Sequence, residues 1–173
     1  EEQRVNLVTD SEDFSGWNAI TRSNIDTDEI LAPDGTLTAD KHYEDSATVG
    51  GGYADYYITW SSAVPFTCSV FAKAGELTSV RLAMTQDSRS AFVPNGQVTF
   101  NLENGTITSG TGVIEDYGNG WFRCIMTATP TATAGSFRIN FTTDTATTDG
   151  YYIWGAQIEQ GAFATSYIPT SGS

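Results

Sequence analysis

Four segments of this chain alternate apolar and polar side chains, and each carries one basic residue on its polar side. In Phe66–Lys73 the apolar residues would share one face of a strand and Lys73 would lie on the other, because successive strand side chains point to opposite faces. The same split places Arg81, Arg123 and Arg138 opposite apolar neighbours. Such strands suit a sheet that buries one face in a core and presents polar, ligand-reading side chains on the other.

The sequence as a whole predicts an all-β protein, built as a two-sheet antiparallel β-sandwich of the jelly-roll type. With 173 residues and 39% hydrophobic content, we expect residues 1–173 to form a single domain with a real core. Asn95-Gly96, Asn104-Gly105 and Asn119-Gly120 indicate turns or hairpins because Asn and Gly tolerate positive φ, and Gly50-Gly51-Gly52 predicts a bent or mobile loop. About eight or nine strands are expected, among them Tyr56–Trp60, Phe66–Lys73, Ser79–Thr85, Gln97–Leu102, Trp121–Thr127, Phe137–Thr142 and Tyr151–Glu159.

Charge and hydropathy exclude several classes of partner. The formal net charge of -13 argues against nucleic acid, since phosphate contacts need a basic footprint. No apolar run approaches the roughly 20 residues that a spanning helix needs, so no membrane partner is expected, and no signal peptide opens the chain. Because the chain starts at Glu1 and ends in the linker-like Thr170-Ser171-Gly172-Ser173, we expect a piece tethered to a larger protein, with oligomer formation left open.

The two cysteines, Cys68 and Cys124, both fall on predicted core faces. An unpaired cysteine packs there as a small hydrophobe. A bridge between them would need their strands to face each other, which sequence spacing does not decide. Two buried thiols are the favoured interpretation.

An ordered set of short motifs runs through nearly the whole chain. It comprises Asn6-Leu7-Val8, Ser11-Glu12-Asp13-Phe14, Trp17, Ala32-Pro33-Asp34-Gly35, Thr38-Ala39-Asp40-Lys41 and the stretches 66–75, 118–124, 152–159 and 166–170. This set resembles the β-sandwich carbohydrate-binding modules of bacteriophage tail and marine polysaccharide-degrading proteins, which are similar in shape to galactose-binding-like and family 4/9 modules. The resemblance implies a noncatalytic jelly roll, extracellular or virion-associated, appended to a tail protein or a glycan-active enzyme. The chain departs from family 4/9 modules at Trp154-Gly155, where those modules often carry two acidic residues.

Sugars are bound by aromatic rings against their apolar faces and by polar side chains that bond their hydroxyls, and Arg can hold a uronate carboxylate bidentately. Because the few positive charges gather on polar strand faces, the sequence predicts an acidic, uronate-containing polysaccharide as the ligand. The alternative is that these are ordinary solvated strand faces, or that the arginines pair with the abundant carboxylates. The predicted ligand-binding residues are Phe71, Lys73, Arg81, Thr85, Arg138, Asn140, Gln157, Tyr53, Tyr56, Tyr57 and His42.

Other aromatic and basic residues stand apart from this set. Trp121 and Arg123 belong to a strand that could lie in the other sheet. Trp17, Trp60 and Trp154 are assigned to the core or its rim, because large aromatic side chains in single sandwiches are usually buried.

The acidic turns suggest a structural calcium ion. Asp10, Glu12 and Asp13 near the start would meet Asp144 and Asp149 before the last strand if the first and last strands are neighbours. Oxygen ligands suit Ca²⁺. The alternative is that these turns are solvated acidic surface. No cofactor is certain.

The sequence lacks the signatures of common enzymes, such as a Gly-x-Ser-x-Gly elbow, a phosphate loop or a His/Cys metal set. The chain has enough carboxylates to supply the acid and base pair of a glycosidase, but its acidic residues cluster in turns. The sequence therefore favours a noncatalytic polysaccharide-binding module that targets an attached enzyme or phage tail protein. Two alternatives stay open: a structural or assembly module of a phage tail or adhesin protein, and a small polysaccharide lyase or hydrolase.

Overall fold

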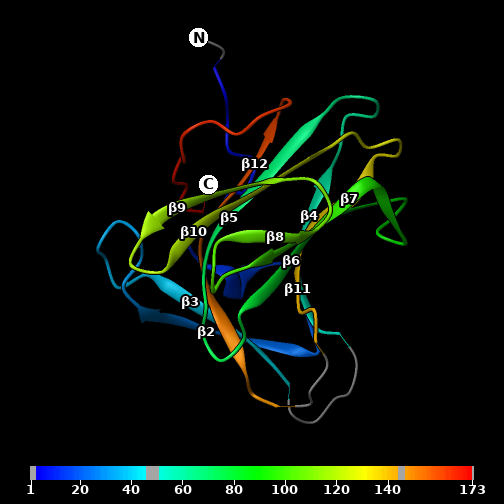
Figure 1. Cartoon of the computed structure of the whole chain (residues 1–173). Helices are drawn as coiled ribbons and strands as arrows, with labels where there is room; N and C mark the ends of the chain where they lie inside the picture. Colours follow the sequence, from blue (N-terminus) through cyan, green and yellow to red (C-terminus); the bar gives the residue numbers. More distant parts are fainter. Residues whose placement is uncertain (1–2, 46–50, 144–146, 173) are drawn as a thin grey trace.

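Two antiparallel six-stranded sheets pack face to face in the computed structural model of the chain (Figure 1), which describes residues 3–45, 51–143 and 147–172. The predicted all-β jelly-roll sandwich is confirmed. The first sheet comprises, in spatial order, β1 (Ala19–Thr21), β4 (Tyr53–Thr59), β11 (Ala134–Asn140), β6 (Ser79–Gln86), β7 (Ala91–Asn101) and β8 (Thr106–Ser109). The second sheet comprises β2 (Ser23–Ile30), β3 (Ala39–Glu44), β12 (Gly150–Gln160), β5 (Phe66–Lys73), β10 (Trp121–Ala128) and β9 (Val113–Gly118). A short 3-10 helix, η1 (Phe14–Gly16), precedes β1.

The core lies between the inward faces of the two sheets, as the alternation of side chains predicted. The central strands of both sheets supply fully buried apolar side chains, among them Leu82, Met84, Phe137, Ile139, Cys68, Val70, Cys124 and Met126. Trp60 lies at one end of this core, and its Nε1 donates a hydrogen bond of 2.7 Å to the backbone carbonyl of Thr85. The one polar group of this large buried ring is therefore satisfied.

The predicted strands are present, and the structure adds further ones. The predicted strand Phe66–Lys73 matches β5 from end to end. The described residues form twelve strands rather than eight or nine. The additional β2, β8 and β9 lie at sheet edges and expose most of their side chains, so no apolar alternation marked them in the sequence.

Two of the three predicted Asn-Gly turns are confirmed as hairpins. Asn104-Gly105 joins β7 to β8, and Asn119-Gly120 joins β9 to β10, with φ of 56° at Asn119 and 84° at Gly120. The third prediction is wrong, because β7 continues through Asn95-Gly96. Asn95 has a φ of 58°, and the register between β6 and β7 shifts beside it, so the pair makes a bulge instead of a turn.

Cys68 and Cys124 are free thiols, both buried, on the neighbouring strands β5 and β10. Burial raises the pKa of both thiols, so they act as inert core side chains. Of the predicted glycine loop, Gly50 lies outside the described residues, while Gly52 accepts a backbone hydrogen bond from Phe141 just before β4. In the described part of the chain, no helix is long and apolar enough to cross a membrane.

Gly135 of β11 provides a test of this packing. A Cβ added at Gly135 would overlap both the Thr85 carbonyl oxygen and Trp60 Nε1. We expect Gly135→Ala to lower the free energy of unfolding by about 2–4 kcal/mol, because the cost of overpacking and the cost of losing a buried hydrogen bond both apply. Gly16→Ala, where a Cβ meets nothing within 4 Å, is the control and should change stability by less than about 1 kcal/mol. Urea unfolding followed by tryptophan fluorescence measures both, and equal midpoints for the two variants would contradict the packing.

Candidate functional site

The outer face of the first sheet brings together five of the predicted ligand-binding residues. The register pairs Asn140 with Tyr53 on one side and with Arg81 on the other, so these three side chains form a row across β4, β11 and β6. Tyr57 and Arg138 lie on the same outward side of β4 and β11. We call this surface the first-sheet face, defined by Tyr53, Asp55, Tyr57, Arg81, Arg138 and Asn140.

Arg138 is held in place by Asp55, its neighbour on β4. Arg138 Nε donates to Asp55 Oδ1 and Nη2 donates to Oδ2, each at 2.8 Å. The ring of Tyr53 lies against the guanidinium, with Arg138 Cζ 3.8 Å from the ring centroid. This bidentate pair therefore neutralises Arg138 and fixes both the guanidinium and the tyrosine ring on the sheet.

Arg81 differs from Arg138 because it forms no ion pair with a carboxylate of the described residues. Its Nε donates to Thr99 Oγ1 on β7 at 3.3 Å, and the side chain is half-buried. Beside it, Asn140 Oδ1 is buried and lacks a hydrogen-bond partner within the described residues. The row thus offers a ligand guanidinium N–H groups, whereas the amide oxygen of Asn140 has no exposed surface.

Charge is distributed unequally between the two sheets. Of the 21 acidic residues in the chain, Asp55 is the one that falls within the strands of the first sheet, which also carry Arg81 and Arg138. The strands of the second sheet carry Asp26, Asp28, Glu29, Asp40, Glu44, Glu115, Asp116 and Glu159. The first-sheet face is therefore locally positive in a strongly acidic chain.

Arg89 borders the first-sheet face, and no sequence pattern pointed to it. It lies in the turn between β6 and β7, and its Cζ is 3.9 Å from the ring centroid of Tyr57. Asp87, Ser88 and Arg89 all have positive φ, a conformation that non-glycine residues rarely adopt. The turn places a third arginine beside an exposed tyrosine.

Thr85 is outward on the first sheet, as predicted, but it is buried. Its hydroxyl shares a hydrogen bond of 2.7 Å with the hydroxyl of Ser136, which is also buried. The hydroxyl of Thr85 is therefore paired within the protein, and ligand contact by Thr85 stays a prediction.

Phe71, Lys73 and Gln157 lie on the other sheet, so the prediction that they share one surface with Arg81 and Arg138 is wrong. Phe71 and Lys73 are on β5 and Gln157 is on β12. Arg123, on β10, is likewise in the second sheet, as the sequence allowed. The sandwich thus separates the four basic residues of the alternating segments, Lys73 and Arg123 from Arg81 and Arg138, onto opposite sides.

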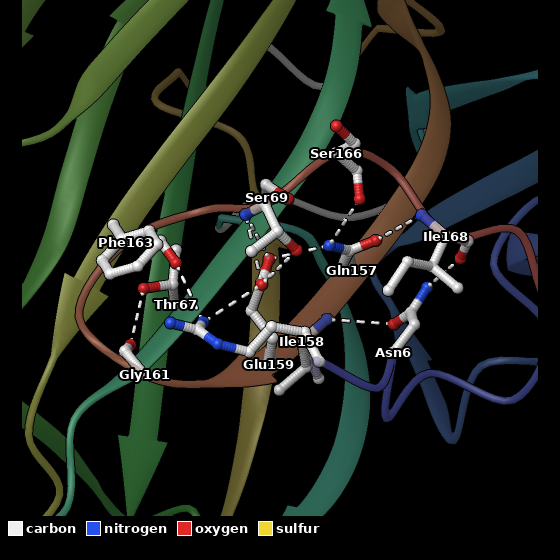
Figure 2. Close-up of polar contacts among 12 residues, drawn as sticks. Asn6, Thr67, Ser69, Gln157, Ile158, Glu159, Gly161, Phe163, Ser166 and Ile168 are labelled. Carbon is white, nitrogen blue, oxygen red and sulfur yellow. Dashed lines mark hydrogen bonds and ion pairs between the residues drawn. The ribbon is translucent and has the colours of Figure 1, made fainter. Parts of the chain in front are cut away.

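Gln157 is part of a buried polar network beneath the C-terminal segment (Figure 2). Its Nε2 donates to Glu159 Oε2 at 2.7 Å, and its Oε1 accepts from the backbone N–H of Ile168 at 2.7 Å. Glu159 also accepts from Arg4 at 3.2 Å and from Thr165, and Asn6 donates to the carbonyl of Ile168 at 2.9 Å. Gln157 therefore ties the chain ends to the second sheet, and both its amide nitrogen and its amide oxygen are bonded within the protein.

Two other predicted contacts point into the protein. Tyr56 packs against Trp17 in the core, and its hydroxyl bonds to Thr9 and to the carbonyl of Leu7. His42 is fully buried between Tyr151 and Ser23, with ring nitrogens 2.8 Å and 3.0 Å from their hydroxyls. Strand alternation turns both side chains inward, with Tyr56 half-buried and His42 fully buried, and ligand contact by either stays a prediction.

The expected calcium set does not assemble. Ala156 of β12 bonds to Ser11, whereas Asp149 precedes the other end of β12, about 20 Å away along the strand. Asp10, Glu12 and Asp13 do line one hollow together with Asp28. Asp144 lies outside the described residues. Within the described ranges, no group of three or more His, Cys, Asp or Glu is arranged to hold a metal ion.

The tryptophans lie where the sequence placed them. Trp17 and Trp60 are in the core, and Trp154 is buried in a smaller cluster on the outer side of the second sheet with Phe71 and Trp121. Tyr117 and Tyr167 join that cluster, and neither was predicted. Their contact with Phe71 spans distant parts of the chain, which strand alternation does not reveal.

No protein-family model and no curated protein matches the sequence. Among solved structures, the enzymatically active domain of tailspike protein 4 of bacteriophage CBA120 has a TM-score of 0.54 at 14% identity, over 87% of this chain and 20% of the tailspike chain. A carbohydrate-binding module from lichenase 5A of Cellvibrio mixtus, in complex with cellotriose, has a TM-score of 0.51 at 10% identity, over 91% of this chain and 99% of that module. At these identities the likeness establishes the fold. The chain spans about one fifth of the tailspike chain, and its resemblance to β-sandwich carbohydrate-binding modules is confirmed as a fold.

The environment of His42 predicts a loss of stability in acid. Burial lowers the pKa of His42 from 6.5 to about 3, so below pH 6.5 the unfolded chain takes up a proton that the folded chain does not. The stabilisation that neutral His42 contributes to the free energy of unfolding is therefore fully present above pH 6.5. It falls as the pH drops toward 3, with a slope approaching about 1.4 kcal/mol per pH unit. Between pH 7 and pH 4, the unfolding free energy of the wild type should fall more steeply with decreasing pH than that of His42→Gln. An NMR titration in which the imidazole protonates near pH 6.5 would contradict this.

Proposed function

We propose that the chain is a noncatalytic module that binds a polysaccharide across the first-sheet face. The observation that carries the proposal is that the register of β4, β11 and β6 sets the Tyr53 ring and the Arg81 guanidinium on either side of Asn140 on the outward face. A sugar needs an apolar ring to lie against and polar groups in fixed positions to bond its hydroxyls. This row supplies both.

Tyr53 and Tyr57 would be the platforms for sugar rings. Each is stacked by an arginine, Tyr53 by Arg138 and Tyr57 by Arg89, so neither ring needs to be ordered when a ligand arrives. The Arg138–Asp55 pair would bond sugar hydroxyls without adding net charge. These contacts would serve neutral and acidic sugars alike.

Arg81 is the residue that would distinguish an acidic polysaccharide. It is half-buried and without an ion pair among the described carboxylates, so a uronate would gain a charge-assisted bidentate contact there. The scarcity of acidic residues on the first-sheet strands supports an acidic ligand at Arg81. The net charge of -13 on the whole chain nevertheless repels polyanions at long range. Binding to a uronate polymer should therefore strengthen as salt screens the chain.

The same face supports binding over catalysis. Glycoside hydrolysis uses two carboxyl groups that flank the scissile bond. The strands of the first sheet hold one carboxyl group, Asp55, and it is committed to Arg138. We therefore propose that the module anchors a longer protein, outside the cell or on a virion, to a surface polysaccharide.

Arg81→Gln tests the acidic preference. At about 0.1 M salt, affinity gel electrophoresis in polygalacturonate or alginate should show binding about 10-fold or more weaker than wild type, because a hydrogen bond to a charged group is lost. Binding to a neutral β-glucan should stay unchanged. Lys73→Gln removes the same charge from the opposite sheet and is the control. Equal uronate binding by wild type and Arg81→Gln would overturn the acidic assignment.

Tyr53→Ala and Tyr57→Ala test the function itself on a glycan array. Both variants should lose binding to every glycan that the wild type retains, whether neutral or acidic. Unchanged binding in the double variant would place the site elsewhere. New reducing ends or unsaturated uronates released by the purified chain would favour a hydrolase or lyase, and a stable oligomer without glycan binding would favour an assembly module.

A further inference from the structure

A small hollow with aromatic walls lies on the outer surface of the second sheet, on the opposite side of the sandwich from the first-sheet face. We call it the aromatic hollow, and it is formed by Phe71, Tyr117, Trp154 and Tyr167 with Asp34 and Ser166 at its rim. Its volume is about 260 Å³. Pockets for drug-sized ligands measure roughly 300–1,000 Å³, so this one suits a group of a few heavy atoms.

The four rings pack against one another at steep angles. Phe71 and Tyr117 have centroids 4.8 Å apart and planes at 89°, and Phe71 and Trp154 have centroids 5.3 Å apart and planes at 61°. Trp154 and Tyr167 have centroids 4.9 Å apart and planes at 59°. Rings at these separations are in contact with one another, and Phe71 and Trp154 are only 3% and 4% exposed, so the exposed ring surface of the hollow belongs to Tyr117 and Tyr167.

The polar ends of two of these rings are bonded to neighbouring protein groups. The hydroxyl of Tyr167 lies 2.6 Å from Ser11 Oγ and donates to Glu12 at 2.9 Å. Trp154 Nε1 donates to Thr38 Oγ1 at 3.0 Å. These bonds hold the two rings in place before any ligand binds. Tyr117, from the edge strand β9, is 50% exposed.

The surroundings of the aromatic hollow are acidic. Asp34 lies on the rim, with its Oδ1 fixed by the backbone N–H and hydroxyl of Thr36. Glu12 bonds the hydroxyl of Tyr167, and the adjacent hollow adds Asp10 and Asp13. Burial, together with the charges of Glu12 and Asp34, raises the pKa of Tyr167. The field of these carboxylates therefore reaches the rings.

One cation lies behind the aromatic hollow. Arg123 Cζ is 5.6 Å from the centroid of Phe71, and the guanidinium donates to the carbonyl of Thr165 and to Ser69 Oγ. Arg123 is buried, so it is a fixed part of the floor. A cationic ligand would then depend on Tyr117 and Tyr167, the two rings of the hollow that are not buried.

We propose that the aromatic hollow binds a compact organic cation, such as the trimethylammonium group of a choline-like ligand. Ring faces carry negative potential, and several rings around one cation bind it through cation–π attraction. The Asp34 carboxylate adds charge complementarity, and the acidic chain draws cations toward its surface. An anionic ligand would be repelled, and an uncharged apolar group would desolvate Asp34 without compensation.

Choline and its uncharged isostere 3,3-dimethylbutan-1-ol, added separately to the purified chain, test this directly. Aromatic ¹H–¹³C NMR shifts of the tyrosine and tryptophan rings report binding. We expect choline to shift these signals and to bind about tenfold or more tightly than the isostere. The affinity for choline should fall as the salt concentration rises. Equal affinities would overturn the cation assignment in favour of a plain apolar pocket, and shifts with methyl glucoside but not choline would overturn it in favour of a sugar.

Single substitutions test whether choline binds in the aromatic hollow. Tyr117→Leu keeps an apolar wall without a ring and should weaken choline binding severalfold, whereas Tyr117→Phe should retain it. Asp34→Asn should weaken it as well, while still accepting from Thr36. Tyr57→Leu, on the first-sheet face, is the control and should leave choline binding unchanged while affecting glycans. If Tyr117→Leu binds choline as wild type does, the site is not the aromatic hollow, whatever the outcome for polysaccharide binding.

Discussion

The packing of two apolar sheet faces against each other is the constraint on which the rest of the structure depends. Burial of the inward side chains stabilises the sandwich, and it commits every alternate residue of every long strand to the core. Each sheet then has one remaining face, and the two remaining faces look away from each other. Polar side chains on strands of different sheets can never meet, however similar their sequence contexts.

The two outward faces differ in how much of each is covered by other segments of the chain. The second sheet is partly covered by the segments at both ends of the chain, through the buried network of Asn6, Gln157, Glu159 and Arg4 (Figure 2). Buried polar groups of this kind are costly unless every one is paired, so the network dictates how the ends lie on the sheet. Among the described residues, no such network covers Tyr53 and Arg81 on the first sheet.

Charge reinforces this division. A chain with a net charge of -13 would repel acidic polymers from any surface, yet its first-sheet strands hold a single acid that is paired with Arg138. Eight acids fall on the strands of the second sheet, against one on the strands of the first. One molecule thus carries a locally basic, open face and, on its other side, a compact aromatic hollow in an acidic field. The two surfaces suit ligands of different size and charge, so their proposed activities can be separated by mutation.

The amino-acid sequence alone determined the fold class and the strand centres, because the period-two alternation of β5, β6, β10 and β11 is a local property that each segment carries by itself. It also determined that Cys68 and Cys124 would be buried, since both sit on the apolar side of their strands. The exposed edge strands escaped prediction because they bury too little to show alternation. What the tertiary structure alone decided is which strands share a sheet: it placed Arg81 and Arg138 with Tyr53 and Asn140, and it moved Phe71, Lys73 and Gln157 to the opposite side. Strand pairing joins residues as far apart as Asp55 and Arg138, and alternation within one segment contains no information about which distant segment it will bond to.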